Sequence, residues 1–420
     1  MAYQKTKLKN KTNLYLVPLD NTKAVTVLVM YPVGSRYESS KLNGVSHFIE
    51  HLMFKGTKKR PNTLTLTREI DRLGAQYNAF TSKEYTGYYI KTDAKYLETA
   101  LDILSDMLLN SKFDVREMEK EKTVIVEELR MYKDNPIMNI ENVFEELMFE
   151  GCPLGWDIGG TEKKVMQYKR NEVLNFRKKY YNPENTTIAV AGKTDDKTID
   201  IVEKYFGSNK NGIKLDKKFQ TGKFGLASKS KRLRVEQKKT DQAQLMMGFP
   251  GFHHNHKSSP VLSVLNTILG GSMSSRLFIQ IRERRGLAYM IRSGADSFRD
   301  IGYVYIRAGL EAKNINKAIG VVKQELEKIK SKGVTKKELQ DAKTHIRGGL
   351  SLTMEDSSSQ ASWYARQALF VDKIKTPEDK LIEIEKVTNE QIIALANKIF
   401  KEGKMRVAVI GDVKREEIEF

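Results

Sequence analysis

Five consecutive residues, His47-Phe48-Ile49-Glu50-His51, hold two imidazoles and a carboxylate within little more than one helical turn. His47 and His51 are four residues apart, so on a helix their side chains share one face. Two imidazoles placed in this way can bind one Zn²⁺ ion, and Glu50 lies on the same side, where it can handle a proton. The order H-x-x-E-H reverses the commoner H-E-x-x-H zinc-binding motif. The alternative interpretation is a chance cluster on an amphipathic helix, although the chain has only 6 His in 420 residues.

A catalytic zinc site usually has three protein ligands and one open position, so a third ligand is needed. Two carboxylates on a later helical pattern, Glu121 and Glu128, are seven residues apart and share one helix face. Glu127 points about 100° away from Glu128 and is predicted to face solvent. Taken alone, these residues are also what an ordinary charged helix face presents.

Together these motifs resemble the pitrilysin and mitochondrial-processing-peptidase family of inverted-motif zinc metallopeptidases, over nearly the whole chain. That family has a glutamate ligand 77 residues after the second His, which matches Glu128, and a supporting glutamate seven residues earlier, which matches Glu121. The flanking sequences fit as well: Gly44-Val45-Ser46, Leu52-Met53-Phe54-Lys55-Gly56-Thr57 and Asn78-Ala79-Phe80-Thr81. The resemblance implies one Zn²⁺ per chain, held by His47, His51 and Glu128.

The activity implied by the resemblance is that of a zinc-dependent endopeptidase acting on peptides or unfolded protein segments. Glu50 would be the general base toward a metal-activated water that attacks the scissile carbonyl, and Glu121 would orient a ligand from behind. A non-catalytic or processing-complex subunit of the same family, requiring a partner chain, is the alternative. Such subunits have lost motif residues, whereas this chain retains them all.

Two further segments are implicated in substrate binding by the same resemblance. The residues Asn78, Ala79 and Phe80 match an exposed edge strand to which the substrate adds as an extra β-strand. For Asn78 the alternative is an ordinary polar residue at a strand end. In the second half, Arg282 and Tyr289 match an Arg/Tyr pair that donates to substrate carbonyls and to the oxyanion. The adjacent Arg284 and Arg285 are interpreted as surface charge.

The chain is internally duplicated. Residues 113–129 align with 334–350 at a constant offset of 221, and Gly87-Tyr88-Tyr89-Ile90 resembles Gly302-Tyr303-Val304-Tyr305-Ile306. Chance similarity between Lys/Glu-rich helices is the alternative, but two blocks occur in the same order. Glu121 corresponds to Ala342 and Glu128 to Gly349, so the second half is predicted to retain the scaffold without the metal site.

Hydrophobic periodicity predicts an α+β fold. The resemblance implies two homologous domains, each a largely antiparallel β-sheet packed with helices, as in processing-peptidase-like metallohydrolases. The expected domains are residues 1–207 with the zinc site, a basic linker at 208–228, and 229–420 with the Arg/Tyr pair. In longer relatives with four such domains, a zinc domain faces an Arg/Tyr domain across a chamber. We therefore expect a homodimeric clamshell in which zinc from one chain and Arg282 with Tyr289 from the other complete each active site.

Composition argues against other classes of protein. The net charge is +19, and residues 210–239 alone carry +9, but only Phe219 and Phe224 in that stretch could stack on bases, so no nucleic-acid partner is expected. The chain has no run of 18 apolar residues, so no membrane partner is expected. The single Cys152 and the absence of an apolar leader favour the cytoplasm. The cluster His253-His254-Asn255-His256 lacks carboxylate or Cys partners and is interpreted as a polar loop.

Overall fold

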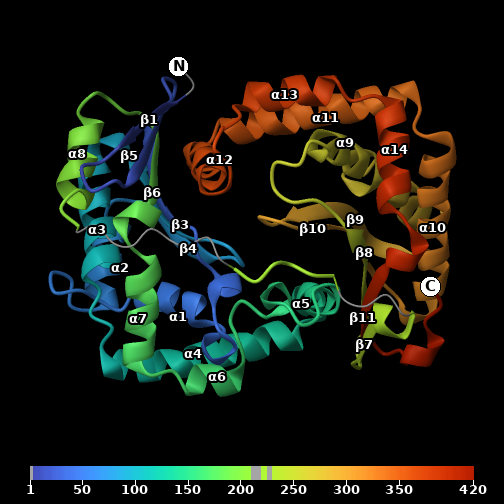
Figure 1. Cartoon of the computed structure of the whole chain (residues 1–420), viewed down its shortest axis with the longest axis horizontal. Coiled ribbons are helices and arrows are strands. Elements are labelled where there is room, and N and C mark those ends of the chain that lie inside the picture. The colour runs from blue at the N-terminus through green and yellow to red at the C-terminus, as the bar shows by residue number, and fades with distance from the viewer. Residues whose placement is uncertain (1–2, 210–218, 225–228) are drawn as a thin grey trace. The chain divides into compact units, whose positions relative to one another are not determined.

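The computed structural model describes residues 3–209, 219–224 and 229–420. The chain forms two compact units, each built from one sheet and its helices (Figure 1). Unit 1 comprises Met1–Leu129, Trp156–Gln220 and Leu352–Ile374, and unit 2 comprises Arg130–Gly155, Thr221–Ser351 and Lys375–Phe420.

The sheet of unit 1 has six strands in the order β1-β2-β6-β3-β5-β4. Their bounds are β1 (Gln4–Lys7), β2 (Asn13–Pro18), β3 (Ala24–Tyr31), β4 (Gln76–Thr81), β5 (Thr86–Asp93) and β6 (Thr187–Gly192). Only β2 and β6 pair in parallel, and the other neighbours are antiparallel. The strand β4 lies at one end of the order, so one of its two edges has no neighbouring strand within the described sheet.

The central strand β3 explains how this sheet is buried on both faces. Its sequence, AVTVLVMY, is apolar apart from Thr26, as expected for a strand covered on both sides. Val25, Val27 and Val29 face the core that also contains Phe48 and Leu101, whereas Leu28 and Met30 face a second cluster that contains Tyr364. Successive side chains of β3 point to opposite faces of the sheet, so this one strand contributes to two hydrophobic cores.

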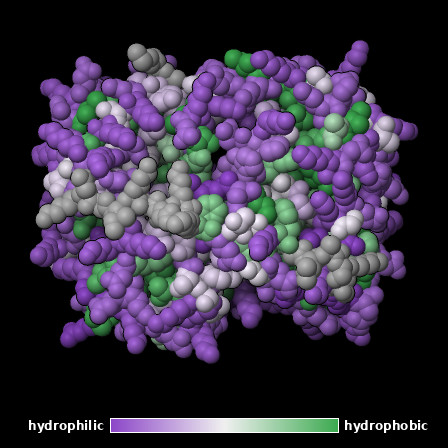
Figure 2. All heavy atoms as spheres, in the orientation of Figure 1, coloured by the Kyte–Doolittle hydropathy of each residue, from purple (hydrophilic) through white to green (hydrophobic). Residues whose placement is uncertain are grey.

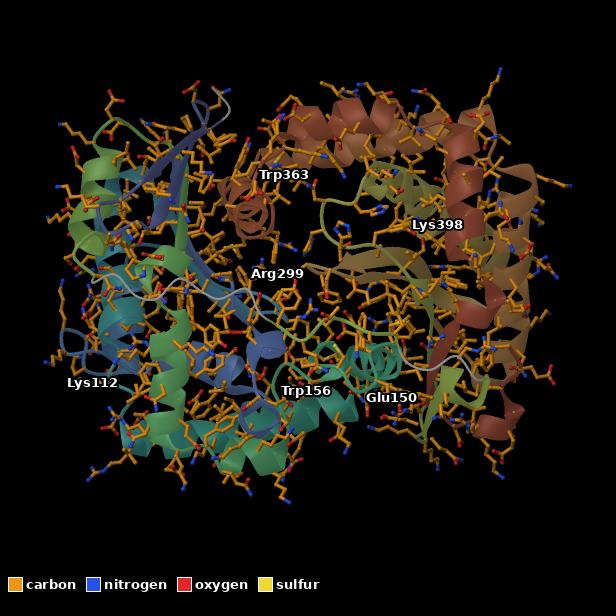
Figure 3. All side chains as sticks on the ribbon, in the orientation of Figure 1. Lys112, Glu150, Trp156, Arg299, Trp363 and Lys398 are labelled. Atoms are coloured by element: carbon orange, nitrogen blue, oxygen red, sulfur yellow. The ribbon has the colours of Figure 1, made fainter. Side chains whose placement is uncertain are left out.

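The helices of unit 1 cover the two faces of this sheet. Their bounds are α1 (Val45–Leu52), α2 (Thr63–Asp71), α3 (Leu97–Asn110), α4 (Val115–Asp134), α6 (Glu162–Met166), α7 (Arg170–Tyr180), α8 (Thr198–Phe206) and α12 (Ser357–Phe370). Figure 3 labels Trp363 on α12, the helix that packs on β3 and β6 although it comes late in the chain.

The sheet of unit 2 repeats the order of unit 1 without the first strand: β7-β11-β8-β10-β9 corresponds to β2-β6-β3-β5-β4. Its strands are β7 (Leu233–Gln237), β8 (Ala243–Pro250), β9 (Ala288–Ser297), β10 (Gly302–Leu310) and β11 (Arg406–Gly411). Again one pair, β7 with β11, is parallel and the rest are antiparallel. The matching topology confirms the predicted α+β fold with two homologous, largely antiparallel halves.

The helices of unit 2 are α5 (Pro136–Met148), α9 (Ser259–Gly270), α10 (Ile315–Lys332), α11 (Lys336–Met354), α13 (Pro377–Glu385) and α14 (Asn389–Ile399), with a π-helical turn at Phe278–Glu283. The unit has its own large core, in which Leu265, Ile306 and Val409 are almost fully buried.

The two units exchange one helix each. The helix α5 follows α4 in the first half of the sequence but packs on β8 and β11 of unit 2, and α12 follows α11 in the second half but packs on the sheet of unit 1. The predicted division at residues 207 and 229 follows the chain and does not include this exchange. Within the predicted linker, residues 210–218 and 225–228 lie outside the described residues.

The surface agrees with the low mean hydropathy of the chain. Hydrophilic residues cover most of the face seen in Figure 2, with apolar residues scattered among them. Among the helices that the structure describes, none combines the length and the apolar character needed to cross a membrane.

Candidate metal centre and substrate-binding residues

The helix α1 carries the H-x-x-E-H motif and begins at a glycine-dependent turn. Gly44 has φ +99°, a left-handed conformation, and a Cβ there would lie 2.4 Å from the carbonyl oxygen of Gly159. The Glu38 carboxylate accepts hydrogen bonds from the backbone N–H groups of Gly44 and Ser46, at 2.7 and 2.8 Å. A carboxylate at this end satisfies free N–H groups and favours the helix dipole, so it fixes where α1 starts.

Burial of the apolar residues of α1 determines which way the motif points. Phe48, Ile49 and Leu52 have no exposed surface and lie in the core of unit 1. The remaining motif residues, His47, Glu50 and His51, are partly exposed. Packing therefore aims the three polar side chains away from the core on one helix face.

The side chains of His47, His51 and Glu128 converge, as the sequence predicted. The two Nε2 atoms are 3.2 Å apart, and the Glu128 Oε2 atom lies 3.5 Å from His51 Nε2 and 3.8 Å from His47 Nε2. Tetrahedral bonds of about 2.05 Å to zinc place two ligand atoms about 3.3 Å apart. The donor set therefore fits a zinc ion closely, and in the described part of the chain it is the one His/Cys/Asp/Glu group of this kind.

A second carboxylate contacts His51 through Nδ1, the ring nitrogen that does not face the other ligands. Glu121, only 3% exposed, accepts a hydrogen bond from His51 Nδ1 at 2.8 Å through Oε1, and its Oε2 lies 2.5 Å from the Lys55 ammonium. Donation from Nδ1 leaves the Nε2 lone pair of a neutral His51 free to bind a metal. Burial opposes ionisation of Glu121, but the hydrogen bonds from His51 and Lys55 prevail and lower the pKa of that carboxyl.

The two histidines differ electrostatically. Burial, reinforced by the neighbouring His51, lowers the pKa of His47 to about 3, so its imidazole is neutral at pH 7. Burial also acts to lower the pKa of His51, but the hydrogen bond to Glu121 and the surrounding carboxylates raise it above its ordinary value. A metal ion can bind His47 without displacing a proton from it. Binding to His51 competes with a proton, because the pKa of His51 is raised.

Glu50 lies beside the ligand set and outside it. Its Oε2 accepts a 2.5 Å hydrogen bond from the Thr81 hydroxyl at the end of β4. Burial raises the pKa of Glu50, while the Thr81 hydrogen bond acts in the opposite direction. A carboxylate with a raised pKa and one fixed oxygen is suited to accept a proton with the other oxygen.

The three predicted substrate-binding residues of unit 1 lie on the edge strand β4. Asn78 is exposed and its Oδ1 accepts the backbone N–H of Ala79, which is buried. The Phe80 ring covers Gly87 on β5, where a Cβ would come within 2.3 Å of it. The side chains of Ala79 and Phe80 are thus used for packing, and the outer backbone edge of β4 is what these residues can offer a peptide.

In unit 2, Arg282 and Tyr289 lie together. The Arg282 guanidinium is 5.2 Å from the centre of the Tyr289 ring and 4.9 Å from that of Phe278. In the register of β9 with β10, Ala288 pairs with Leu310 and Met290 with Gly309, which leaves Tyr289 as an extra, unpaired residue. This β-bulge explains why Tyr289 is 72% exposed on a sheet strand.

Two residues contact the motif in ways that the sequence did not predict. Lys55, four residues after His51, pairs with Glu121, and Thr81 holds Glu50. The i to i+4 spacing from His51 is the signal that could have identified Lys55. Thr81 follows Phe80 on the strand, and only the packing of α1 on β4 shows its partner.

The cluster at 253–256 lies in the loop before α9, as predicted. The His256 ring stacks on Phe252 at 4.1 Å, and its Nδ1 accepts the backbone N–H of Ser258 at 3.1 Å. These contacts use His256 for loop packing.

Comparison with known proteins agrees with this geometry. The model of the Insulinase family (Peptidase family M16) matches residues 15–162, and that of the Peptidase M16 inactive domain matches residues 167–346. The zinc protease YmxG of Bacillus subtilis is 36% identical over 398 residues, which cover 94% of this chain and 95% of that protein. The chain belongs to peptidase family M16.

Other members of family M16 are similar over comparable lengths. A zinc protease of Mycobacterium leprae is 34% identical over 398 residues, which cover 94% of this chain and 88% of that protein. The crystal structure of a protease from Helicobacter pylori superposes with a TM-score of 0.90 at 24% identity, covering 97% of this chain and 99% of that one, which supports the fold alone. The resemblance to the pitrilysin family is confirmed.

The inactive-domain match agrees with the composition of unit 2. At the positions that correspond to Glu121 and Glu128, α11 carries Ala342 and Gly349. No metal-ligating group of three residues occurs among the described residues of this unit. Among the residues that the structure describes, His47, His51 and Glu128 are therefore the one candidate metal centre.

Proposed function

We propose that this chain is a zinc-dependent endopeptidase that hydrolyses peptides or unfolded protein segments. The observation that carries the proposal is the convergence of His47, His51 and Glu128 to near-tetrahedral spacing, with Glu50 beside them. The names of the similar proteins from Bacillus subtilis and Mycobacterium leprae, both zinc proteases, support the same metal and reaction.

Glu50 is assigned the proton transfers of the reaction. When bound, Zn²⁺ supplies a Lewis acid that polarises the scissile carbonyl and lowers the pKa of water. The Glu50 carboxylate accepts the proton that water loses as its oxygen bonds to the carbonyl carbon. It then delivers that proton to the amine nitrogen as the C–N bond breaks, so Glu50 is again a carboxylate at the end of the reaction. The Thr81 hydroxyl holds one oxygen of Glu50 and leaves the other for this exchange.

The substrate is proposed to bind as an extended strand. A peptide added at the outer edge of β4 gains main-chain hydrogen bonds next to α1, with Asn78 at the exposed surface of that strand. Only chain segments free of their own β-pairing can bind in this way, so folded proteins are poor substrates. Arg282 and Tyr289 are assigned to the substrate carbonyls and the oxyanion, as hydrogen-bond donors placed in advance.

We further propose that the active form is a homodimer with composite sites. The candidate metal centre and the Arg282/Tyr289 pair belong to different compact units of the chain. A second copy is proposed to supply the pair that faces each metal centre. Mixing Glu50→Gln protein with Arg282→Ala protein tests this, because a mixed dimer then contains one intact composite site. Restored cleavage supports the shared site, and inactivity despite proven subunit exchange contradicts it.

The test of the peptidase proposal combines zinc analysis with a quenched fluorescent peptide library. The wild type should contain one zinc per chain and cleave, Glu50→Gln should retain zinc and lose cleavage, and Glu128→Gln should lose both. Glu127→Gln is the matched control, because Glu127 neighbours Glu128 on α4 and is exposed. A wild type that binds zinc without cleaving any peptide would favour the non-catalytic subunit instead.

A further inference from the structure

Two arginines lie directly opposite each other on the edge of the unit 2 sheet. In the antiparallel register of β9 with β10, Arg292 pairs with Arg307. Residues opposed in this way have Cβ atoms about 5 Å apart, and like charges there destabilise the sheet. The pair therefore needs a reason beyond the folding of this sheet.

The described residues leave this positive charge without a directly bound anion. Arg307 is only 7% exposed, its Nη2 donates to the backbone carbonyl of Ile137 on α5, and its Nε has no hydrogen-bond partner. Burial, together with the charge of Arg292, lowers the pKa of Arg307, and Glu141 is the acid that acts in the opposite direction. Burial raises the pKa of the neighbouring Tyr305, and the acids Asp296 and Glu141 act in the same direction, against Arg292 and Arg307.

One member of this pair is accessible to solvent. Arg292 is exposed, and the next residue of β9 on the same face is Gly294, which has no side chain. The Tyr305 ring of β10 occupies the space over Gly294, where a Cβ would lie 2.6 Å from it. A buried guanidinium, an exposed guanidinium and the Tyr305 ring thus lie around the same small area.

The position along β9 connects this area with the Arg282/Tyr289 pair. Arg292 follows Tyr289 by three residues, and the bulge at Tyr289 shifts the alternation so that Met290 and Arg292 lie on the face of Arg307. Three strand residues span about 10 Å. An extended peptide bound at Tyr289 would reach the arginine pair with a side chain about three positions away.

We propose that Arg292 and Arg307 form a carboxylate-binding subsite through which this chain selects acidic peptides. The proposal rests on the peptidase function above, because it assigns the carboxylate to a peptide substrate. Arg307, held by the Ile137 carbonyl, supplies a fixed donor, and Arg292 closes on the carboxylate from the exposed side, since guanidinium groups bind carboxylates with two parallel hydrogen bonds.

The test compares peptides that differ in one residue, Glu or Gln, scanned over the four positions on each side of the cleaved bond. All peptides carry an amidated C-terminus, and one Gln peptide is also made with a free carboxylate. Binding is measured by fluorescence anisotropy and cleavage by mass spectrometry, for the wild type, Arg292→Gln and the control Arg284→Gln. Arg284 is an exposed arginine on the same unit, so both variants lose the same charge.

The wild type should bind the best Glu peptide about tenfold more tightly than its Gln counterpart. Arg292→Gln should abolish that preference without weakening the Gln peptide, and Arg284→Gln should retain it. The wild type could instead prefer the Gln peptide that has a free C-terminal carboxylate. If Arg292→Gln removes that preference, the subsite binds the C-terminus of the peptide. Equal binding of Glu and Gln peptides by the wild type, or equal losses in both variants, overturns the proposal. Selective binding without any cleavage leaves the subsite standing and refutes the peptidase function.

Discussion

Replacing Glu121 by Gln isolates the charge that stands behind the candidate metal centre. Gln retains the shape and an oxygen that can accept the 2.8 Å hydrogen bond from His51 Nδ1, but it loses the negative charge. Hydrogen bonds to a charged group are about twice as strong as neutral ones, and Glu121 is only 3% exposed, so water screens little of the loss. Changes to groups that orient a ligand typically weaken metal binding about 10- to 100-fold. We expect a loss in that range, which is about 1.4–2.7 kcal/mol.

The assay is competition for zinc against a chromophoric chelator, with Glu119→Gln as the matched control. Glu119 lies on the same helix, is 60% exposed in its side chain and pairs with Lys122, so its removal should leave zinc affinity unchanged. Thermal unfolding of both metal-free variants separates a loss of stability from a loss of affinity. Unchanged zinc affinity in Glu121→Gln would mean that Glu121 serves only its ion pair with Lys55. An equal loss in Glu119→Gln would mean that the loss reflects the charge of the helix and not the contact of Glu121 with His51.

Three further predictions concern an ion pair, a buried aromatic side chain and the removal of zinc. Glu338 pairs with Arg276 at 2.6 Å, which is the main cause that lowers the pKa of Glu338 to about 2. This carboxylate therefore stabilises the fold above its unfolded pKa of about 4.3 and ceases to do so as the pH falls toward 2. After allowance for its 30% exposure, Glu338→Gln should cost about 1–2 kcal/mol in denaturant titrations at pH 7, with the difference from wild type shrinking below pH 4. Phe144→Ala should destabilise unit 2 by about 3–5 kcal/mol in the same titrations, because this fully buried ring of α5 packs against Gly248 of β8. A loss below about 1 kcal/mol would contradict the packing of α5 on that sheet. Removal of zinc by a chelator should lower the calorimetric unfolding temperature of unit 1 alone, because zinc bound at a free concentration a thousandfold above Kd adds about 4 kcal/mol to its free energy of unfolding. An equal shift of both units would contradict a single metal centre.

Residue spacing grouped the metal ligands on each helix, and the family resemblance joined the two groups. His47 and His51 share a helix face because of their spacing, and Glu121 and Glu128 share another for the same reason. Spacing within each helix does not say how the two helices meet, so the assignment of Glu128 as the third ligand came from the family resemblance. That resemblance gave Glu121 a supporting role without naming His51 as its partner. The contacts of Lys55 and Thr81 were not predicted, since they depend on where α1 ends and on its packing against β4.

The duplicated topology was predictable, whereas the exchange of helices was not. The repeated blocks around Gly87 and Gly302 predict equivalent strands, and β5 and β10 do occupy equivalent places. The helices α5 and α12 show the ordinary mixture of apolar and polar residues, and that pattern says only that a helix is partly buried. The sheet on which each helix packs is determined by contacts with residues far away in the sequence, and the pattern of residues within the helix does not identify those contacts.

The same packing argument explains how the two copies came to differ in chemistry. A buried carboxylate is costly unless it is paired, and Glu121 is paired on both oxygens, by His51 and Lys55. A copy without the histidines would still bear the energetic cost of the buried carboxylate, although no metal ligand would remain for that carboxylate to orient. In unit 2 the equivalent position is Ala342, which is 4% exposed and belongs to the apolar core. Loss of the ligands therefore favours loss of the buried charge behind them, while the helix and its contacts persist.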